Sequence, residues 1–353
     1  MSERKRMDHF DGLRAYAMLL IIASHTEAFH FSVGGIIVAL FLVLSGFFAA
    51  RPGEQRFFEL EYLRPVNWLR YYALKIVRMI PVYWLVLLVV YAADLFKGVS
   101  ATPSVLLENM FLINANGHLW YVQNQMVIYL FVPALLLLSC AIRKPLKEKG
   151  NVIGGILLVA AGVGLQFWLR LSKPILLMGN GKGQYLRLGL FVIGLGFGTL
   201  MKAAGSRRIT RPAAKAAADI LILLLLVSCA FAAPEYLKLI GMKLKTGLGW
   251  KYPEWCGLGL GLLVVLLYLN SEGLMARLLS IRPLRIIGEA SFSMYLVQSF
   301  YIRALKALPS KEIKWMLVCL TAAGVAVMSW QLFEKPLYQA VRRWLYPAKT
   351  PGT

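Results

Sequence analysis

The stretch GGIIVALFLVLSGFFAA at residues 34–50 contains no charged side chain. Such a run is long enough to cross the ~30 Å hydrocarbon core of a bilayer as a helix. Similar apolar blocks recur along the chain of 353 residues, of which 59% are hydrophobic and 16% are charged. Because soluble chains carry roughly 25% charged residues, these blocks argue against a soluble enzyme, a nucleic-acid-binding domain and a secreted disulfide scaffold. The sequence predicts an all-α polytopic membrane protein.

Hydropathy and helix breakers predict about ten transmembrane helices, with no internal repeat among them. The predicted spans lie at 13–30, 34–50, 79–96, 120–142, 151–169, 185–201, 213–233, 253–270, 284–303 and 313–333. Between the second and third spans, residues 51–78 are rich in arginine and aromatic side chains, and we expect an interfacial amphipathic helix there. Residues 1–340 are expected to form one transmembrane domain, and residues 341–353 a short cytoplasmic tail.

The basic residues predict which way the chain lies in the membrane. The net charge is +22, and on the predicted map 26 of the 39 Lys and Arg lie on the side that holds both termini. Since Lys and Arg mark the cytoplasmic face, we expect both termini in the cytoplasm, with basic loops on anionic lipid headgroups and no nucleic-acid partner. The N-terminal segment shows no small-residue cleavage site, so no removable signal peptide is expected. The four cysteines have no paired spacing, and neither a disulfide nor a metal site is expected.

The first span carries ionisable residues at a depth where an unpaired one is costly. Arg14 and His25 are eleven residues apart, which places them on one helix face, roughly 16 Å apart along the axis. Asp11 lies one turn before Arg14 on the same side. His25 is either a hydrogen-bonding partner of a neighbouring helix or a general base, for which an imidazole is suited. We expect His9 and His30 to be solvated.

The second span contains two small residues and the third span is preceded by two basic residues, and each pair can be interpreted in two ways. Ser45 and Gly46 form either a small-residue helix contact or a place where the backbone approaches a ligand. Lys75 and Arg78 are one helical turn apart at the cytoplasmic start of the third span. They either clamp phosphates or follow the positive-inside rule alone.

The fourth span begins with a polar cluster among aromatics, at His118, Trp120, Asn124 and Gln125. An aromatic belt at the interface is one explanation. A substrate site is the other, because the cluster holds more hydrogen-bonding side chains than a belt requires.

The ninth and tenth spans carry polar residues near the cytoplasmic face. Glu289 and Ser293 are neighbours at i,i+4, and Ser291 lies between them. We expect Glu334 to pair with a basic residue.

Together these segments make the chain similar to a known family. They are Phe10-Asp11-Gly12-Leu13-Arg14-Ala15 with His25, Phe41-Leu42-Val43-Leu44-Ser45-Gly46-Phe47, Lys75-x-x-Arg78 with Pro81-x-Tyr83, His118-Leu119-Trp120-Tyr121, Gly288-Glu289-Ala290-Ser291-Phe292-Ser293-Met294-Tyr295-Leu296 and Glu334-Lys335-Pro336. Over nearly its full length the chain resembles the membrane acyltransferase-3 family, bacterial enzymes that O-acylate surface polysaccharides, O-antigens, peptidoglycan, nodulation glycolipids and some macrolides.

The resemblance implies a multi-pass protein of the bacterial inner membrane that moves an acyl group, commonly acetyl, from acetyl-CoA or another acyl-CoA to a hydroxyl of a glycan or glycolipid. It implies that His25 is the catalytic imidazole, and that Arg14 either holds the acyl-CoA path or orients this face of the first span. With His25, Arg14 and Asp11 are the candidate catalytic residues. Lys75 and Arg78 would grip the CoA phosphates. The remaining candidates for substrate binding or oxyanion stabilisation are Ser45, His118, Trp120, Asn124, Gln125, Glu289 and Ser291.

The chain departs from the family pattern in three places. Lys75 replaces an arginine, Gln298 stands where many members have a histidine, and residues 123–125 offer amides where many carry a glutamate. Two alternatives remain: a transporter in which the Asp, Arg and His of the first span relay protons or substrate, and a catalytically inactive relative that binds lipid or glycan.

Overall fold

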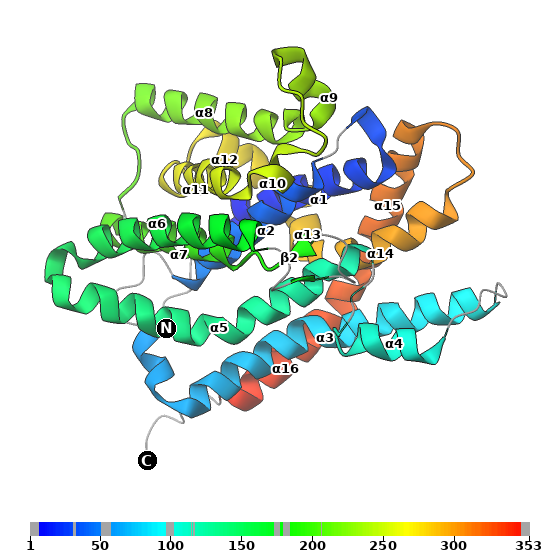
Figure 1. Ribbon diagram of the computed structural model, residues 1–353, viewed down its shortest axis with the longest axis horizontal. Helices are drawn as coiled ribbons and strands as arrows, with labels where there is room; N and C mark the ends of the chain where they lie inside the picture. The colour runs from blue at the N-terminus through cyan, green and yellow to red at the C-terminus, as the bar shows by residue number, and fades with distance from the viewer. Residues whose placement is uncertain are drawn as a thin grey trace.

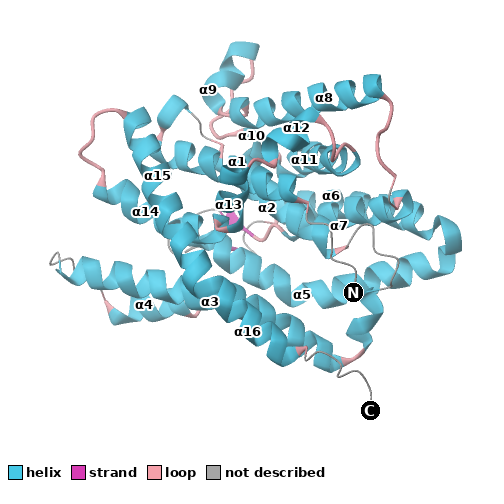
Figure 2. Ribbon diagram, turned by 180° about the vertical axis from the view of Figure 1, so that it is seen from behind, coloured by secondary structure: helices cyan, strands magenta, loops and turns pink. Residues whose placement is uncertain are grey.

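The protein is almost entirely helical, as Figures 1 and 2 show from opposite sides. The computed structural model describes residues 7–30, 33–50, 58–96, 102–113, 115, 117–172, 177–178, 184–205 and 207–346. The longer helices are α1 (Asp8–Thr26), α2 (Gly34–Ala49), α3 (Pro65–Phe96), α5 (Trp120–Arg143), α6 (Gly150–Leu171), α7 (Leu188–Ala204), α8 (Pro212–Phe231), α11 (Pro253–Leu269), α14 (Ser291–Ala304), α15 (Lys311–Ser329) and α16 (Lys335–Leu345). The short elements are α4 (Pro103–Met110), α9 (Pro234–Leu237), α10 (Leu248–Lys251), α12 (Leu274–Leu279), α13 (Arg282–Glu289) and a two-stranded hairpin of β1 (Leu177–Met178) and β2 (Gln184–Tyr185).

Every predicted span coincides with a helix, and the prediction of a polytopic membrane protein is confirmed. Within the described residues, five helices are long and apolar enough to cross a membrane, and α2, α7 and α11 are shorter apolar helices. The helices α1 and α14 fall outside this group because their sequences carry the polar residues of the site described below. Several helices and connecting turns begin with proline, whose fixed φ and missing N–H suit the first turn.

The segment after the second span differs from the expected separate helix. Residues 51–57 lie outside the described residues, and from Pro65 the chain runs without interruption into the predicted third span as α3. Neither glycine nor proline occurs between residues 66 and 80, so nothing in the sequence stops the helix there. The 32 residues of α3 extend about 48 Å at 1.5 Å per residue, so its basic, aromatic first part reaches beyond the hydrocarbon core.

The ninth and tenth spans also differ in detail. The ninth breaks at Ala290 into α13 and α14. The tenth continues past its predicted end through one π-helical turn, Trp330–Glu334, into α16. Such turns frequently occur at functional sites, and this one places two side chains in the site described below.

The centre of the fold is α7, which packs between α2 and α6 through glycines. A Cβ on Gly46 of α2 would lie 1.9 Å from the carbonyl oxygen of Phe191, and one on Gly194 would lie 2.1 Å from that of Val43. On the other face of α7, a Cβ on Gly162 of α6 would lie 2.6 Å from the backbone nitrogen of Ile193. Small residues allow such close approach in membrane helices. Of the two interpretations of Ser45-Gly46, the structure supports the helix contact for Gly46.

Glycines also fix the position of α1, which carries His25. A Cβ on Gly12 would lie 1.7 Å from the carbonyl oxygen of Leu279, and one on Gly288 would lie 1.8 Å from that of Asp11. The contacts at both ends show that α1 and α14 run in the same direction, since His25 meets Gln298 one helix length further on. The polar contact between these two helices is that of His25 with Gln298.

Candidate active site

His25 lies near the end of α1, between α14 and the turn at Gly117–Leu119. Its Nδ1 is 3.3 Å from Oε1 of Gln298, a residue of α14 with an exposed fraction of 0%. The His25 side chain itself is exposed. A reactive nitrogen on an accessible ring, held from behind by a buried amide, is the arrangement that a general base requires.

A second imidazole stands beside the first. The ring centroids of His25 and His118 are 6.4 Å apart, and His118 is 5.3 Å from the ring of Tyr295. The hydroxyl of Tyr295 donates to the backbone carbonyl of His118. Tyr121 stacks edge-on to Tyr295 at 5.3 Å and donates to Oε1 of Gln125 at 3.2 Å. The structure therefore brings the predicted residues His25, His118 and Gln125 into one aromatic and polar group.

The other end of α1 holds the predicted ion pair. Arg14 Nη1 lies 2.7 Å from Asp11 Oδ1, and the guanidinium lies over the ring of Phe48 at 5.6 Å. Both side chains are partly exposed. Asp11 and Arg14 lie one helical turn apart and form an ion pair, so Asp11 orients the guanidinium of Arg14.

Arg78 lies in a neighbouring cluster built by α3, α13 and the π-helical turn. Its guanidinium stacks on Trp330 at 3.8 Å, and Nη2 donates to the carbonyl oxygen of Glu289 at 3.2 Å. Trp330 Nε1 in turn donates to Glu289 Oε2 at 3.1 Å. Within the described residues, the buried Nη1 of Arg78 has no hydrogen-bond partner. A buried cationic donor of this kind is suited to an anionic ligand.

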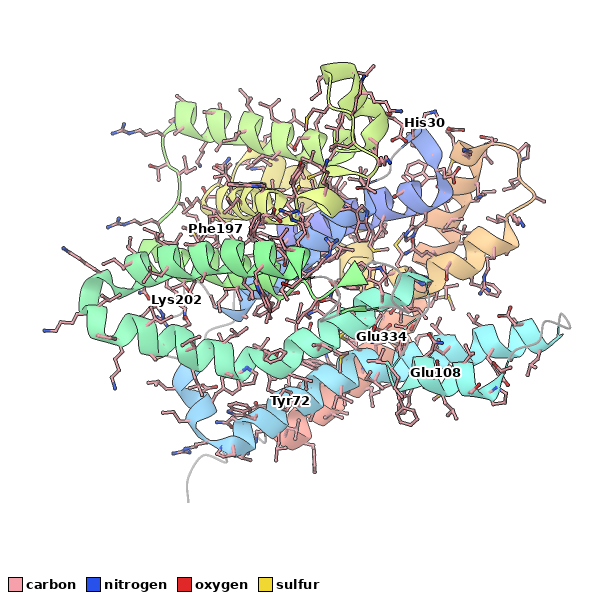
Figure 3. All side chains as sticks on the ribbon, viewed as in Figure 1. His30, Tyr72, Glu108, Phe197, Lys202 and Glu334 are labelled. Atoms are coloured by element: carbon pink, nitrogen blue, oxygen red, sulfur yellow. The ribbon has the colours of Figure 1, made fainter. Side chains whose placement is uncertain are left out.

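Glu334 closes the same cluster, and Figure 3 shows it at the centre of the molecule. Its Oε1 accepts from Ser293 and, at 2.9 Å, from Ser329. A basic partner was expected for Glu334, and its charge attracts the guanidinium of Arg78. The hydrogen bonds to its carboxylate come from the two serine hydroxyls. Glu289 and Ser293, which are neighbours at i,i+4, each bond one residue of the π-helical turn, Trp330 and Glu334 respectively.

The other predicted binding residues have different surroundings. Lys75 Nζ lies over the ring of Tyr129 at 4.4 Å and over that of Tyr71 at 5.4 Å. Ser45 is half-buried on α2, and Ser291 is buried at the start of α14. His9 was expected to be solvated, and this was wrong: it is 4% exposed, because α1 already begins at Asp8 and packs its first turn into the core.

Trp120 and Asn124 lie on a different face of α5 from Tyr121 and Gln125, and they meet a residue that the sequence analysis did not select. Arg187 has an exposed fraction of 0%, and its guanidinium lies 4.6 Å from the ring of Trp250 and 5.6 Å from that of Trp120. Its backbone N–H donates to Oδ1 of Asn124 at 3.4 Å. An arginine at the start of the predicted sixth span was the available signal, since an ionisable residue in a span is a functional candidate.

Arg187 also joins backbone segments. Its Nη1 donates to the carbonyl oxygens of Gly249 at 3.2 Å and Gly35 at 3.4 Å. Arg187 thus connects α2, α5, α7 and α10. The predicted polar cluster at the start of the fourth span is therefore divided between the His25 group and this structural connection.

In the part of the chain that the structure describes, no group of three His, Cys, Asp or Glu side chains could hold a metal ion. All four cysteines are free thiols.

The helices and their apolar composition define a multi-pass membrane protein. The sequence model of a family described as an acyltransferase domain matches residues 7–333. The chain therefore belongs to the acyltransferase-3 family, as the resemblance implied. Neither the comparison with curated proteins nor the comparison with solved structures found a match.

Proposed function

We propose that this membrane acyltransferase is an O-acyltransferase that moves an acyl group, most simply acetyl, from acyl-CoA to a hydroxyl of a cell-surface glycan or a lipid-linked sugar precursor. The observation that carries the proposal is the accessible imidazole of His25, held by Gln298 at one end of α1, with the cationic residues Arg14 and Arg78 toward the other end. Arg14 and His25 are roughly 16 Å apart along the helix axis, a distance that an extended pantetheine arm can span.

The donor side of the proposal rests on the basic end of the molecule. In Figure 3, Tyr72 and Lys202 lie toward the end where α3 begins and α7 ends, whereas His30 and Glu108 lie toward the opposite end. The more basic connections belong to the Lys202 end, which supports a cytoplasmic position for it and for both termini. Acyl-CoA would approach from there and place phosphates against Arg78, whose stacked guanidinium keeps one buried N–H group available.

The chemistry follows from the His25 group. The acceptor hydroxyl gives its proton to Nε2 of His25 as its oxygen attacks the thioester carbonyl carbon. The tetrahedral oxyanion then collapses, the C–S bond breaks, and the imidazolium returns the proton to the departing thiolate. His118 is the candidate donor to the oxyanion that lies nearest to His25, since Asn124 is engaged by Arg187.

Membership in the acyltransferase family favours this enzyme over a transporter with the same polar residues. A first experiment is acetyl-CoA binding to the purified chain in nanodiscs. We expect Arg78→Gln to abolish saturable binding, with Arg143→Gln as a control on an arginine of α5 that bonds Ser139 and Asn151 instead. Saturable acetyl-CoA binding that survives in Arg78→Gln contradicts the proposed donor site.

A second experiment addresses the acceptor. Mass spectrometry of surface glycans from a bacterial strain lacking this gene should show the loss of an acyl mass that returns with the wild-type gene. An unchanged glycan profile together with transport of a solute would favour the transporter. Acetyl-CoA binding with an unchanged profile of acylated glycans would favour an inactive relative.

A further inference from the structure

Gln298 is the side chain that bonds the reactive imidazole. The amide is fully buried on α14, one helical turn beyond Tyr295. Its Oε1 faces Nδ1 of His25 at 3.3 Å. In this orientation Nε2 of Gln298 points away from His25 and has no hydrogen-bond partner within the described part of the chain.

An amide oxygen can only accept a hydrogen bond. The contact therefore requires a proton on Nδ1 of His25, and a neutral ring then carries its lone pair on Nε2. The hydrogen bond made by one ring nitrogen decides which nitrogen is protonated. Gln298 thus selects the tautomer whose lone pair is on Nε2, the nitrogen that it does not contact.

The Gln298 amide carries no charge, and no charged side chain takes its place as the hydrogen-bond partner of His25 within the described residues. Glu27, the residue that follows α1, is exposed and is paired with Lys311 of α15 at 2.8 Å. On α14, Arg303 lies 3.7 Å from Asp94 of α3. The ring in contact with His25 is that of His118, and Tyr295 and Tyr121 follow it in turn. Within the described residues, no carboxylate bonds the ring, and the side chain that does bond it is the uncharged amide of Gln298.

We propose that Gln298 is a positioning residue that holds His25 in the tautomer with Nδ1 protonated and Nε2 free to take the proton of the acceptor hydroxyl. The inference rests on the proposed function. Throughout the transfer Nδ1–H stays hydrogen-bonded to Oε1, and the single proton that moves passes from the hydroxyl to Nε2 and then to the thiolate.

The tautomer can be measured directly, because the chain has only four histidines. The full-length protein, labelled with ¹⁵N in the imidazole rings and held in nanodiscs, gives separate ring-nitrogen signals, and His25→Asn assigns that of His25. We expect a protonated Nδ1 and an unprotonated Nε2 for His25 in the wild type. Gln298→Leu should convert this signal to the Nε2–H tautomer or a mixture, and Gln298→Glu, which keeps an accepting oxygen, should retain Nδ1–H.

A matched control is Gln166→Leu, which replaces another fully buried glutamine, on α6, and should leave the His25 signal unchanged. A wild-type His25 with Nε2–H would mean that the Gln298 amide faces the other way, and would overturn the inference. So would a Gln298→Leu signal identical to that of the wild type.

Kinetics separate this inference from the proposed function. With acetyl-CoA as donor and release of free CoA thiol as the signal, Gln298→Leu should lower kcat about 10- to 100-fold, the range seen when the partner orienting a metal-bound histidine is removed. The KM for acetyl-CoA should stay within twofold, and Gln298→Glu should recover part of kcat. Full activity of His25→Asn would refute the proposed function itself. Loss of activity in His25→Asn with an unchanged kcat in Gln298→Leu would refute only the role of Gln298.

Discussion

Replacing Gly46 by alanine tests whether the Ser45-Gly46 segment is a helix contact. The added Cβ would lie 1.9 Å from the carbonyl oxygen of Phe191, whereas ordinary contact begins at 3.4 Å, so α2 and α7 must separate by about 1.5 Å. Overpacking of this kind costs typically about 1–3 kcal/mol. Alanine recovers at most about 1 kcal/mol of helix propensity relative to glycine. The net effect is a loss of up to about 2 kcal/mol.

The matched control is Gly164→Ala on α6, because a Cβ there meets nothing within 4 Å. Here the propensity gain acts alone, and we expect the stability to stay equal or to rise slightly. The assay is the unfolding temperature of the purified protein in detergent, followed by the loss of the monodisperse peak on size-exclusion chromatography. A Gly46→Ala protein as stable as Gly164→Ala would refute the helix contact. If it were stable but had lost acyl transfer, the ligand interpretation of Gly46 would be favoured.

Two further predictions concern charged pairs and the donor cluster. Glu254 is 1% exposed and is bonded by Arg170 at 2.8 Å, so Glu254→Ala should lower the unfolding free energy by about 3–5 kcal/mol. The control Glu272→Ala breaks an exposed pair and should cost less than about 1 kcal/mol. Equal unfolding temperatures of the two variants would contradict this prediction. Trp330→Leu removes the stacking on Arg78, worth about 0.5–2 kcal/mol, and should raise the Kd for acetyl-CoA by roughly 2- to 30-fold, which isothermal titration would detect; an unchanged Kd would place the donor elsewhere.

The spans could be predicted because a run of apolar residues alone is enough to specify a membrane helix. The break at Ala290 and the π-helical turn at Trp330–Glu334 were not predictable in this way. Both lie within or beside apolar segments, and they arise where side chains of several helices bond to one another. Hydropathy carries no information on such contacts.

The sequence predicted the residues of the candidate site better than it predicted the contacts between them. The rule that an ionisable residue in a span is a functional candidate selected His25 and Arg14, and the structure gives each a specific partner. The same rule, applied to residue 187, would have found the buried arginine that connects four helices. The pairing of His25 with Gln298 depends on how α1 lies against α13, where Gly288 closely approaches Asp11, and against α14, and it cannot be read from any one of these helices alone.

The central claim is that His25 is the base of acyl transfer. The most direct measurement compares His25→Asn with His30→Asn, an exposed histidine just beyond the same helix whose positive φ of 53° asparagine tolerates. Each variant is introduced into the deletion strain, and immunoblots confirm that both variants are present in the membrane at equal levels. The masses of the surface glycans are then measured by mass spectrometry. We expect the acyl mass to return with His30→Asn and to remain absent with His25→Asn. Acylated glycans in the His25→Asn strain would contradict the account.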